Sequence, residues 1–174
     1  MSIKIDQATI EDLDELVPLF DAYRQFYGED EDLDLARGFL GDRLERNDSA
    51  VFVARGGDGT AIGFAQLFPS FSSTMATFIF ILNDLYVAPD VRGMGVGGAL
   101  LKAAAGFGRE VGAAQLTLST AADNTAAQSL YRSMGWERSE AFWTYNLSLV
   151  WRPSIRLVVA PSGGLTRIMT GAHL

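Results

Sequence analysis

The chain has 174 residues, of which 48% are hydrophobic and 20% are charged, a composition typical of one soluble globular domain. The formal net charge of -7 argues against a nucleic-acid backbone as a partner. The sequence lacks cysteine and has one histidine, His173, which excludes a cysteine nucleophile and leaves zinc without its preferred ligands.

Signals for a membrane or for export are also missing from the sequence. No apolar run is long enough to cross a bilayer, and the first residues turn acidic without a signal-peptide core. We therefore expect a cytoplasmic protein that makes no contact with a membrane.

The first third of the chain has the periodicities of two strands and two helices. These elements are predicted at 2–9 (strand), 10–28 (helix), 33–48 (helix) and 49–55 (strand). Thr9 and Asp12 form an N-cap signature at the start of the first helix. The glycine-rich stretch 56–60 predicts a hairpin turn into the next strand.

A dense acidic run, from Gly28 to Leu35, lies between the two predicted helices and holds five carboxylates in eight residues. Acidic side chains favour the amino end of a helix dipole, so one interpretation is a solvated helix start. The other interpretation is a patch that attracts a cationic substrate.

The rest of the chain predicts three more strands, two helices and a different final segment. The expected elements are strands at 61–73 and 75–87, a helix at 97–112, a strand at 114–120, a helix at 125–135 and a last strand at 142–149. Hairpins followed by βαβ units indicate a mixed sheet in one layered α/β (α+β) core. In the basic segment 150–174, residues 155–160 can add an edge strand, pair with a second subunit, or belong to a loosely held appendage.

Four glycines are packed into the six positions 93–98, directly before a predicted helix. Glycine costs up to about 1 kcal/mol relative to alanine in a helix, so something is expected to approach this backbone closely. A turn with a tight packing spot is the simplest interpretation. A dinucleotide site matches G-x-G-x-x-G, but the first glycine lies beyond the strand end and no acidic residue closes the next strand.

The third interpretation begins from "RGMGVG", which has the pattern R-x-x-G-x-G. It resembles the acetyl-CoA-binding loop of the GNAT superfamily of N-acetyltransferases. Consecutive main-chain N–H groups at a helix start form an anion nest that suits a pyrophosphate. The flanking "LNDLYVAPDVRGMGVGGALL" and the later "NTAAQSLYRSMGW" resemble the two signatures of that family. "AYRQFYG" and "AFWTYNLSL" look most like its small-amine (Hpa2-like) branch.

The resemblance implies the GNAT fold, a central mixed, mostly antiparallel twisted sheet flanked by helices, over 1–149, with 150–174 as a C-terminal extension. It also implies a set of acetyl-CoA contacts: Leu85, Val87, Arg92, Gly93, Met94, Gly95, Val96, Gly97, Gly98, Ala99, Asn124 and Tyr131. Leu85 and Val87 would pair with the pantetheine arm through their backbone. Asn124 would contact the pantetheine, cap its helix, or do both.

The resemblance further implies roles in the reaction. Tyr131 would be the general acid that protonates the leaving sulfur, unless it is only an aromatic on a buried helix face. Where polyamine-type relatives have two acids in a row, this chain has Asn83, which cannot accept a proton at neutral pH, and Asp84. Asp84 would act as base through water or only bind the substrate cation. A bulge beside the site would be needed to turn one of these neighbours inward.

Three aromatic residues of the first helix, Tyr23, Phe26 and Tyr27, either wall an amine pocket or form an ordinary buried helix face. We expect direct acetyl transfer from acetyl-CoA, as cosubstrate and without a metal, to a primary amine of a small cationic molecule. The alternatives are a non-catalytic acyl-CoA-binding module and a protein lysine acetyltransferase. A homodimer is common in the family and is a further expectation.

Overall fold

The computed structural model describes residues 2–141, 143–149, 156–159 and 165–168. The chain separates into two compact units, 1–137 and 138–174. Within the described residues, no helix is long and apolar enough to span a membrane. The predicted boundary between 149 and 150 stays a prediction.

The larger unit has the predicted order of elements, with shorter bounds. Its strands are β1 (Lys4–Gln7), β2 (Ala50–Arg55), β3 (Ala61–Ser72), β4 (Thr77–Val87) and β5 (Leu116–Thr117). Its helices are α1 (Leu13–Phe26), α2 (Leu33–Arg46), α3 (Val96–Glu110) and α4 (Thr125–Ser133), with short 3-10 turns η1 (Ile10–Asp12) and η2 (Pro89–Val91). The strands form one sheet in the order β1-β2-β3-β4-β5, antiparallel except for the parallel pair β4–β5. The predicted mixed, mostly antiparallel sheet is therefore confirmed.

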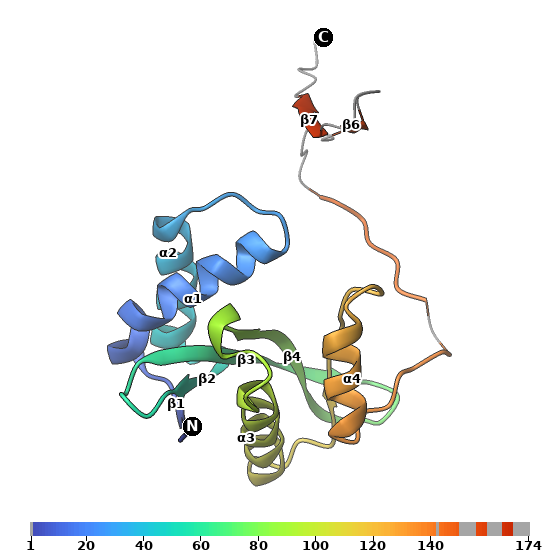
Figure 1. Ribbon diagram of the computed structural model, residues 1–174. Coiled ribbons are helices and arrows are strands. Elements are labelled where there is room, and N and C mark those ends of the chain that lie inside the picture. The colour runs from blue at the N-terminus through green and yellow to red at the C-terminus, as the bar shows by residue number, and fades with distance from the viewer. Residues whose placement is uncertain (1, 142, 150–155, 160–164, 169–174) are drawn as a thin grey trace. The chain divides into compact units, whose positions relative to one another are not determined.

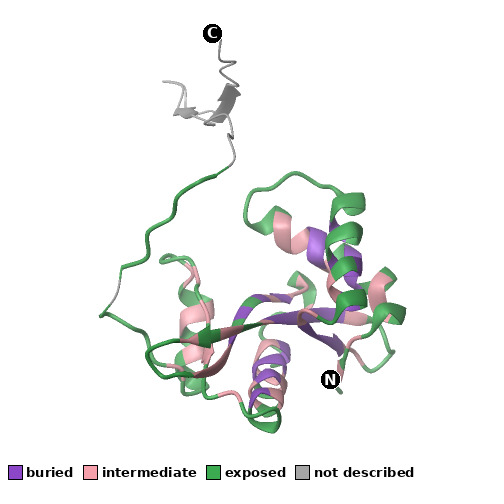
Figure 2. Cartoon of the chain, turned by 180° about the vertical axis from the view of Figure 1, so that it is seen from behind, coloured by how far each residue is buried: buried purple, intermediate pink, exposed green. Residues whose placement is uncertain are grey.

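Helices cover both faces of this sheet, with α1 and α2 on one face and α3 on the other (Figure 1). The core under α1 and α2 consists of Leu16, Val17, Phe20, Ala36, Leu40, Leu44, Val51, Val53, Phe64 and Tyr86. The core under α3 consists of Ala50, Phe52, Ala54, Ile62, Ala65, Leu67, Phe80, Leu82, Val96, Leu100, Leu101 and Ala104. Figure 2 shows the buried residues concentrated along the strands and the inner sides of the helices. Because successive side chains of a strand point to opposite faces, alternate residues of the strands contribute to the two cores.

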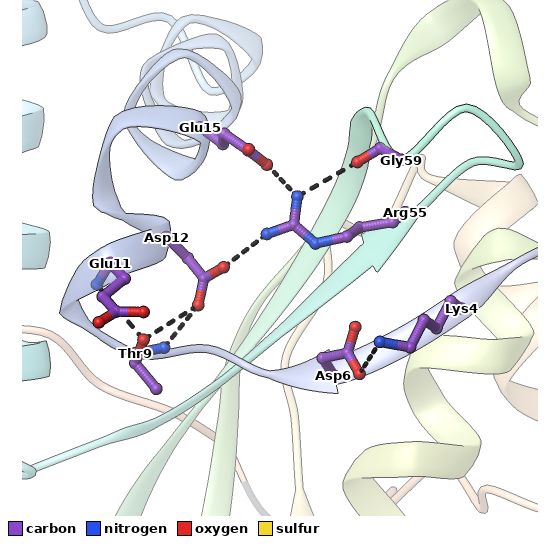
Figure 3. Close-up of polar contacts among 8 residues, drawn as sticks. All are labelled: Lys4, Asp6, Thr9, Glu11, Asp12, Glu15, Arg55 and Gly59. Atoms are coloured by element: carbon purple, nitrogen blue, oxygen red, sulfur yellow. Dashed lines mark hydrogen bonds and ion pairs between the residues drawn. The ribbon is translucent and has the colours of Figure 1, made fainter.

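The start of α1 is fixed to the sheet by Arg55 at the end of β2 (Figure 3). Its guanidinium donates to Asp12 at 2.5 Å, to Glu15 of α1, and to the carbonyl oxygen of Gly59 at 3.3 Å. Asp12 also accepts from the main-chain N–H of Thr9 at 2.8 Å and so completes the predicted capping box. This contact fixes where α1 begins.

A bulge in β4 decides which side chains face the helices. Gln66 of β3 lies opposite Asp84, but the next residue, Leu67, lies opposite Leu82. Asn83 is therefore the extra residue, and beyond it the faces of β4 are exchanged relative to an unbroken alternation. Asp84 consequently points to the α1–α2 face. The bulge required for an inward acid is thus present.

The strand predicted at 114–120 is much shorter than expected. β5 pairs with β4 only opposite Phe80 and Ile81, and α4 begins after a further irregular stretch. Among the described residues, the end of β4 therefore has a strand neighbour on its β3 side alone. A run of alternating residues predicts a strand only as far as a partner strand stays alongside it.

Within its described residues, the smaller unit contains one hairpin, β6 (Arg156–Val159) paired antiparallel with β7 (Leu165–Ile168). The segment 155–160 thus pairs within its own unit over the part that is described. The last strand predicted at 142–149 is wrong, because 143–149 has no regular structure, while residue 142 lies outside the described residues. Alternation is a local pattern, whereas a strand also needs a partner, and the described residues supply none for this segment.

Candidate active site

A cleft of about 480 Å³ opens where the end of β4 meets α1, α3 and α4. Most of the predicted site residues line it: Tyr23, Phe26, Tyr27, Leu85, Val87, Arg92, Gly93, Gly95, Val96, Gly97, Gly98, Asn124 and Tyr131. The other four predicted residues, Asn83, Asp84, Met94 and Ala99, are not part of its lining. Met94 is exposed, and the N–H of Ala99 donates to Gly95 in the first turn of α3.

The four glycines before α3 have two different structural roles. Gly93 (φ 77°) and Gly95 (φ 88°) adopt left-handed backbone conformations that other residues rarely reach, and no atom lies within 4 Å of a Cβ added to either. Gly97 and Gly98 pack against α4 instead, since a Cβ on Gly97 would meet Leu130 at 3.0 Å. The packing interpretation therefore accounts for the second pair only. The first pair shapes a loop whose backbone stays uncovered.

The start of α3 presents main-chain donors to the cleft. The first helical bond that the chain closes here runs from the N–H of Ala99 to the oxygen of Gly95. The N–H groups of 96–98 precede that bond and have no partner within the helix, while their residues line the cleft. Such a helix start attracts anions, phosphate above all.

Arg92 connects three parts of the site. Its Nε donates to the carbonyl oxygen of Val87 at 2.9 Å, and its guanidinium lies 5.7 Å from the ring centroids of both Phe26 and Tyr86. The end of β4, the end of α1 and the glycine loop are joined through this one cation.

At the end of β4, beyond the part paired with β5, backbone groups on the side away from β3 have no strand neighbour among the described residues. Ala88 donates its N–H to Ile62 of β3 at 2.9 Å. Because backbone groups alternate in direction along a strand, those of Leu85 and Val87 face away from β3. This edge of β4 runs along the cleft, and its geometry suits pairing with an extended ligand.

Asp84 is 3% exposed and lies under the α1 side of the cleft. It accepts a hydrogen bond from the side-chain amide of Asn83 at 3.1 Å and interacts with the hydroxyl of Tyr23. Burial raises the pKa of Asp84 above its ordinary value, and these two donors only partly oppose that effect. Burial and the charge of Asp84 also raise the pKa of Tyr23, whose hydroxyl donates to the carbonyl oxygen of Asn83 at 3.4 Å.

Residues of α4 form the opposite wall. The Oδ1 of Asn124 accepts from the N–H of Ala127 at 3.2 Å, which confirms the helix-cap interpretation. The ring of Tyr131 is half-buried, 6.1 Å from that of Trp136. Burial, with a smaller contribution from Tyr27, raises the pKa of Tyr131. Its hydroxyl is therefore protonated at neutral pH and is able to donate.

Of the three predicted aromatics, only Tyr23 packs against the core, whereas Phe26 and Tyr27 are exposed. The ring centroid of Tyr23 lies 5.9 Å from that of Phe64 in the core and 5.1 Å from that of Tyr27. The ring centroids of Tyr27 and Phe26 are 5.2 Å apart. Tyr23 and Phe26 of α1 and Tyr27, which follows the last residue of α1, all line the cleft. They form an aromatic wall close to Asp84, a combination that favours a bound cation.

The acidic run after Gly28 is built into the connection between α1 and α2. Asp32 caps α2 by accepting from Leu35 at 2.9 Å, as the helix-start interpretation predicts. The N–H of Asp32 donates at 3.0 Å to Asp21, a buried carboxylate that also accepts from Arg24 and Gln25 at 2.7 Å each. Burial alone would raise the pKa of Asp21, but these hydrogen bonds outweigh it and lower that pKa.

Residues 13–136 match the acetyltransferase (GNAT) family. The chain belongs to this family. The uncharacterized N-acetyltransferase YhfO of Bacillus subtilis is 43% identical over 147 residues, which are 84% of this chain and 98% of that protein. The crystal structure of a probable acetyltransferase has a TM-score of 0.80 and 40% identity, over 86% of this chain and 99% of the other. A complex of AAC(6')-Iy with the bisubstrate analogue CoA-S-monomethyl-acetylneamine has a TM-score of 0.69 and 25% identity, over 85% and 99%.

Membership in the GNAT family makes the protein an acetyl-CoA-dependent acyltransferase. The site fits such a cosubstrate on its own geometry, because the uncovered loop at Gly93 and Gly95 and the free helix start suit a pyrophosphate.

Sequence reasoning missed six residues that line the cleft: Tyr86, Val91, Thr120, Ala126, Ala127 and Leu130. Two of them carried a signal. Tyr86 follows Asp84 by two positions and so shares its face of β4, and Ala127 precedes Tyr131 by one helical turn. Thr120 carried none, because it belongs to the stretch after β5 that was predicted as strand.

Proposed function

We propose that this GNAT protein transfers the acetyl group of acetyl-CoA directly to a primary amine of a small cationic substrate. One observation carries the proposal: a single cleft has an uncovered glycine loop, a protonated tyrosine on α4, and an aromatic wall next to a buried carboxyl group. These are the parts that acyl transfer to an amine requires, namely an anion site, an acid and a base.

Acetyl-CoA supplies the acetyl group as a thioester. The N–H groups of 96–98, with Arg92 nearby, hold its pyrophosphate at the start of α3. The backbone edge formed by Leu85 and Val87 pairs with its pantetheine arm, and Asn124 contacts that arm from α4. The direction of the β4 backbone groups and the lining of the cleft support these assignments.

Asp84 is the group that receives the proton of the incoming ammonium, directly or through water, while Tyr23 and Asn83 orient its carboxylate. An ordinary carboxyl group is a weak base for an alkylammonium. The raised pKa of Asp84 brings its basicity closer to the operating pH, where a general base is most effective.

Tyr131 donates its hydroxyl proton to the sulfur as the carbon–sulfur bond breaks and the carbon–nitrogen bond forms. The N–H of Val87 donates to the acetyl oxygen as charge develops there. The amine nitrogen loses two protons in all: the first goes to Asp84 before the attack, and the second leaves once the carbon–nitrogen bond has formed and restores the Tyr131 hydroxyl through solvent. Asp84 then gives its proton to solvent, so the site returns to its starting state and one proton is released for each acetyl group transferred. No acyl-enzyme is needed.

A small cationic amine as acceptor is supported by two observations. Tyr23, Phe26 and Tyr27 form the aromatic wall next to Asp84. AAC(6')-Iy, which shares the fold and a quarter of the aligned residues, has been captured with CoA joined to monomethyl-acetylneamine. The cytoplasmic location and the homodimer stay predictions.

The test is release of free CoA thiol from acetyl-CoA in the presence of a panel of amines. The panel pairs polyamines and amino sugars with matched alcohols that lack the amine and with a lysine-containing peptide. We expect thiol release, with acetyl-amine formed in equal amount, for at least one small cationic amine. Bound acetyl-CoA without thiol release across the whole panel would contradict the proposal and favour a binding module.

A further inference from the structure

A second buried polar side chain, Gln66 of β3, lies on the α1–α2 face of the sheet and has no part in the proposed reaction. It is 0% exposed. Its Nε2 donates to the hydroxyl of Ser49 at 2.8 Å. Its Oε1 is buried without a hydrogen-bond partner, the one such side-chain atom within the described residues. An unpaired buried acceptor is costly, so its surroundings need an explanation.

Gln66 is the cross-strand neighbour of Asp84. Phe64 of β3 lies opposite Tyr86 of β4, and both belong to the core under α1 and α2. Two residues further along both strands, Gln66 lies opposite Asp84 on the same face. Side chains that face each other in this way have Cβ atoms about 5 Å apart, within reach of a direct hydrogen bond.

The surroundings of Asp84 offer no cation to stabilise a carboxylate. Among the described residues, Tyr23 faces it from α1, Asn83 lies on its own strand, and no lysine, arginine or histidine pairs with it. On α1, Arg24 pairs with Asp21 at 2.7 Å, and both side chains are held further by residues 25, 30 and 32. The buried core on this face is apolar and includes Val51 of β2, which lies opposite Gln66, and Ala36, Leu40 and Leu44 of α2. A buried carboxyl group without a cationic partner has a raised pKa, so Asp84 holds its proton up to a higher pH than an exposed carboxyl group does.

The two groups therefore complement each other whenever Asp84 is protonated, since its carboxyl group then has a hydroxyl to donate and Gln66 has an acceptor without a partner. We propose that Gln66 is a positioning residue whose Oε1 accepts the hydrogen bond of the protonated Asp84 carboxyl group, with Ser49 fixing the amide orientation. The bond stabilises the neutral acid and makes its conjugate base stronger. The role of that base rests on the proposed function, whereas the hydrogen bond itself does not.

Infrared titration of the substrate-free protein tests this bond. The carbonyl band of protonated Asp84, assigned by its loss in Asp84→Asn, is followed as the pH is raised. Gln66→Met keeps the size of the side chain but removes the acceptor, so the midpoint should fall by about one pH unit, the value of one ordinary hydrogen bond. Ser49→Ala frees the amide to rotate and should lower the midpoint by less. Gln7→Met, at an exposed position of β1, is the control and should leave the midpoint of the Asp84 band unchanged.

Each other result overturns the inference. A midpoint that rises in Gln66→Met means that the amide donates to a carboxylate, and an unchanged midpoint means that Gln66 only fills space. Should Gln66→Met fail to fold, Ser49→Ala decides by the same readout. Because no substrate is present, an inactive protein leaves this test intact. In an active protein, the acid limb of the kcat/KM profile should shift with the infrared midpoint, while the KM for acetyl-CoA stays the same.

Discussion

The two faces of the sheet build their halves of the cleft in different ways. On the α3–α4 side, the decisive features belong to the backbone: two left-handed glycines, the free start of α3 and the edge of β4. On the α1–α2 side, they belong to side chains that come from separate elements: Tyr23 of α1 lines the cleft, whereas Asp84 of β4 and Gln66 of β3 are buried and do not line it. Both halves meet at the end of β4.

This difference explains why the pyrophosphate site of the α3–α4 half could be predicted from a short stretch of sequence, whereas the side-chain site of the α1–α2 half could not. A backbone site for a pyrophosphate needs residue types with strong conformational preferences in an unbroken stretch, and it serves any acceptor substrate equally. A side-chain site can change with single substitutions while the fold stays the same. Under the proposed function, the α3–α4 half is therefore expected to serve any acceptor, and the α1–α2 half is the one expected to select the acceptor.

The largest effect should come from Tyr131→Phe, which removes the proposed acid and leaves the ring. Loss of a positioned general acid lowers kcat by about 10²- to 10⁴-fold. The dissociation constant for acetyl-CoA, measured by calorimetry, should stay within a factor of two or so, because the backbone contacts remain. Tyr145→Phe, far along the chain in 143–149, is the matched control. An unchanged kcat in Tyr131→Phe would remove Tyr131 from the reaction.

Asp21→Ala should have the next largest effect, on stability. It removes the acceptor of three hydrogen bonds that close the α1–α2 connection and leaves Arg24 partly buried without its partner. We expect a loss of about 3 kcal/mol in the free energy of unfolding, measured by urea denaturation. Because the pKa of Asp21 is lowered in the folded protein, its contribution is present above the unfolded pKa and is lost as the pH falls through the folded one.

The comparison makes Asp21→Ala informative about the two halves. Asp42→Ala, which breaks only an exposed ion pair on α2, is its control and should cost well under about 1 kcal/mol. Acetyl-CoA affinity at a temperature where the variant is folded should be unchanged, since the α3–α4 half does not depend on this connection. A parallel loss of acetyl-CoA binding would mean that the halves are not separable.

Gly95→Ala tests the backbone half directly. An alanine at a φ of 88° is strained by roughly 1–2 kcal/mol, and a loop that relaxes to avoid this no longer presents its N–H groups. Acetyl-CoA should bind about tenfold more weakly, and amine specificity should not change. Gly106→Ala, at an α3 position with ordinary φ and open space, should instead stabilise the protein by about 0.5–1 kcal/mol. Equal effects of both substitutions would contradict a special role for the loop.

Most of the fold could be predicted from local patterns, for physical reasons that particular elements show. The spacing of apolar residues predicts the helices α1 and α3. Thr9 and Asn124 mark helix starts, because their side chains accept hydrogen bonds from N–H groups that have no partner within the helix. The strand predicted at 142–149 and the length of β5 were wrong because pairing depends on distant residues, which a local pattern does not contain.

The site, too, could be predicted where it depends on local sequence, but not where it depends on pairing between distant residues. The glycine loop could be found because its conformation is a property of the residues themselves. The inward direction of Asp84 depends on the bulge at Asn83, which the register with β3 creates. Gln66 carried a faint signal, a single amide in the otherwise apolar stretch 61–68, but its partner lies 18 positions further along the chain. Roles that arise from cross-strand pairing need the structure.

The smallest effect, and the sharpest test of the side-chain half, is the pH dependence of stability in Asp84→Asn. The folded pKa of Asp84 is raised, so between the unfolded and folded values the folded protein keeps a proton that the unfolded chain has lost. Wild-type stability should therefore fall as the pH rises through that window, and Asp84→Asn should lack this slope. The variant should be the more stable protein at neutral pH, measured by urea denaturation at a series of pH values. A constant difference at every pH would mean that folding does not raise the pKa of Asp84, which would undo both its tuned basicity and its bond to Gln66.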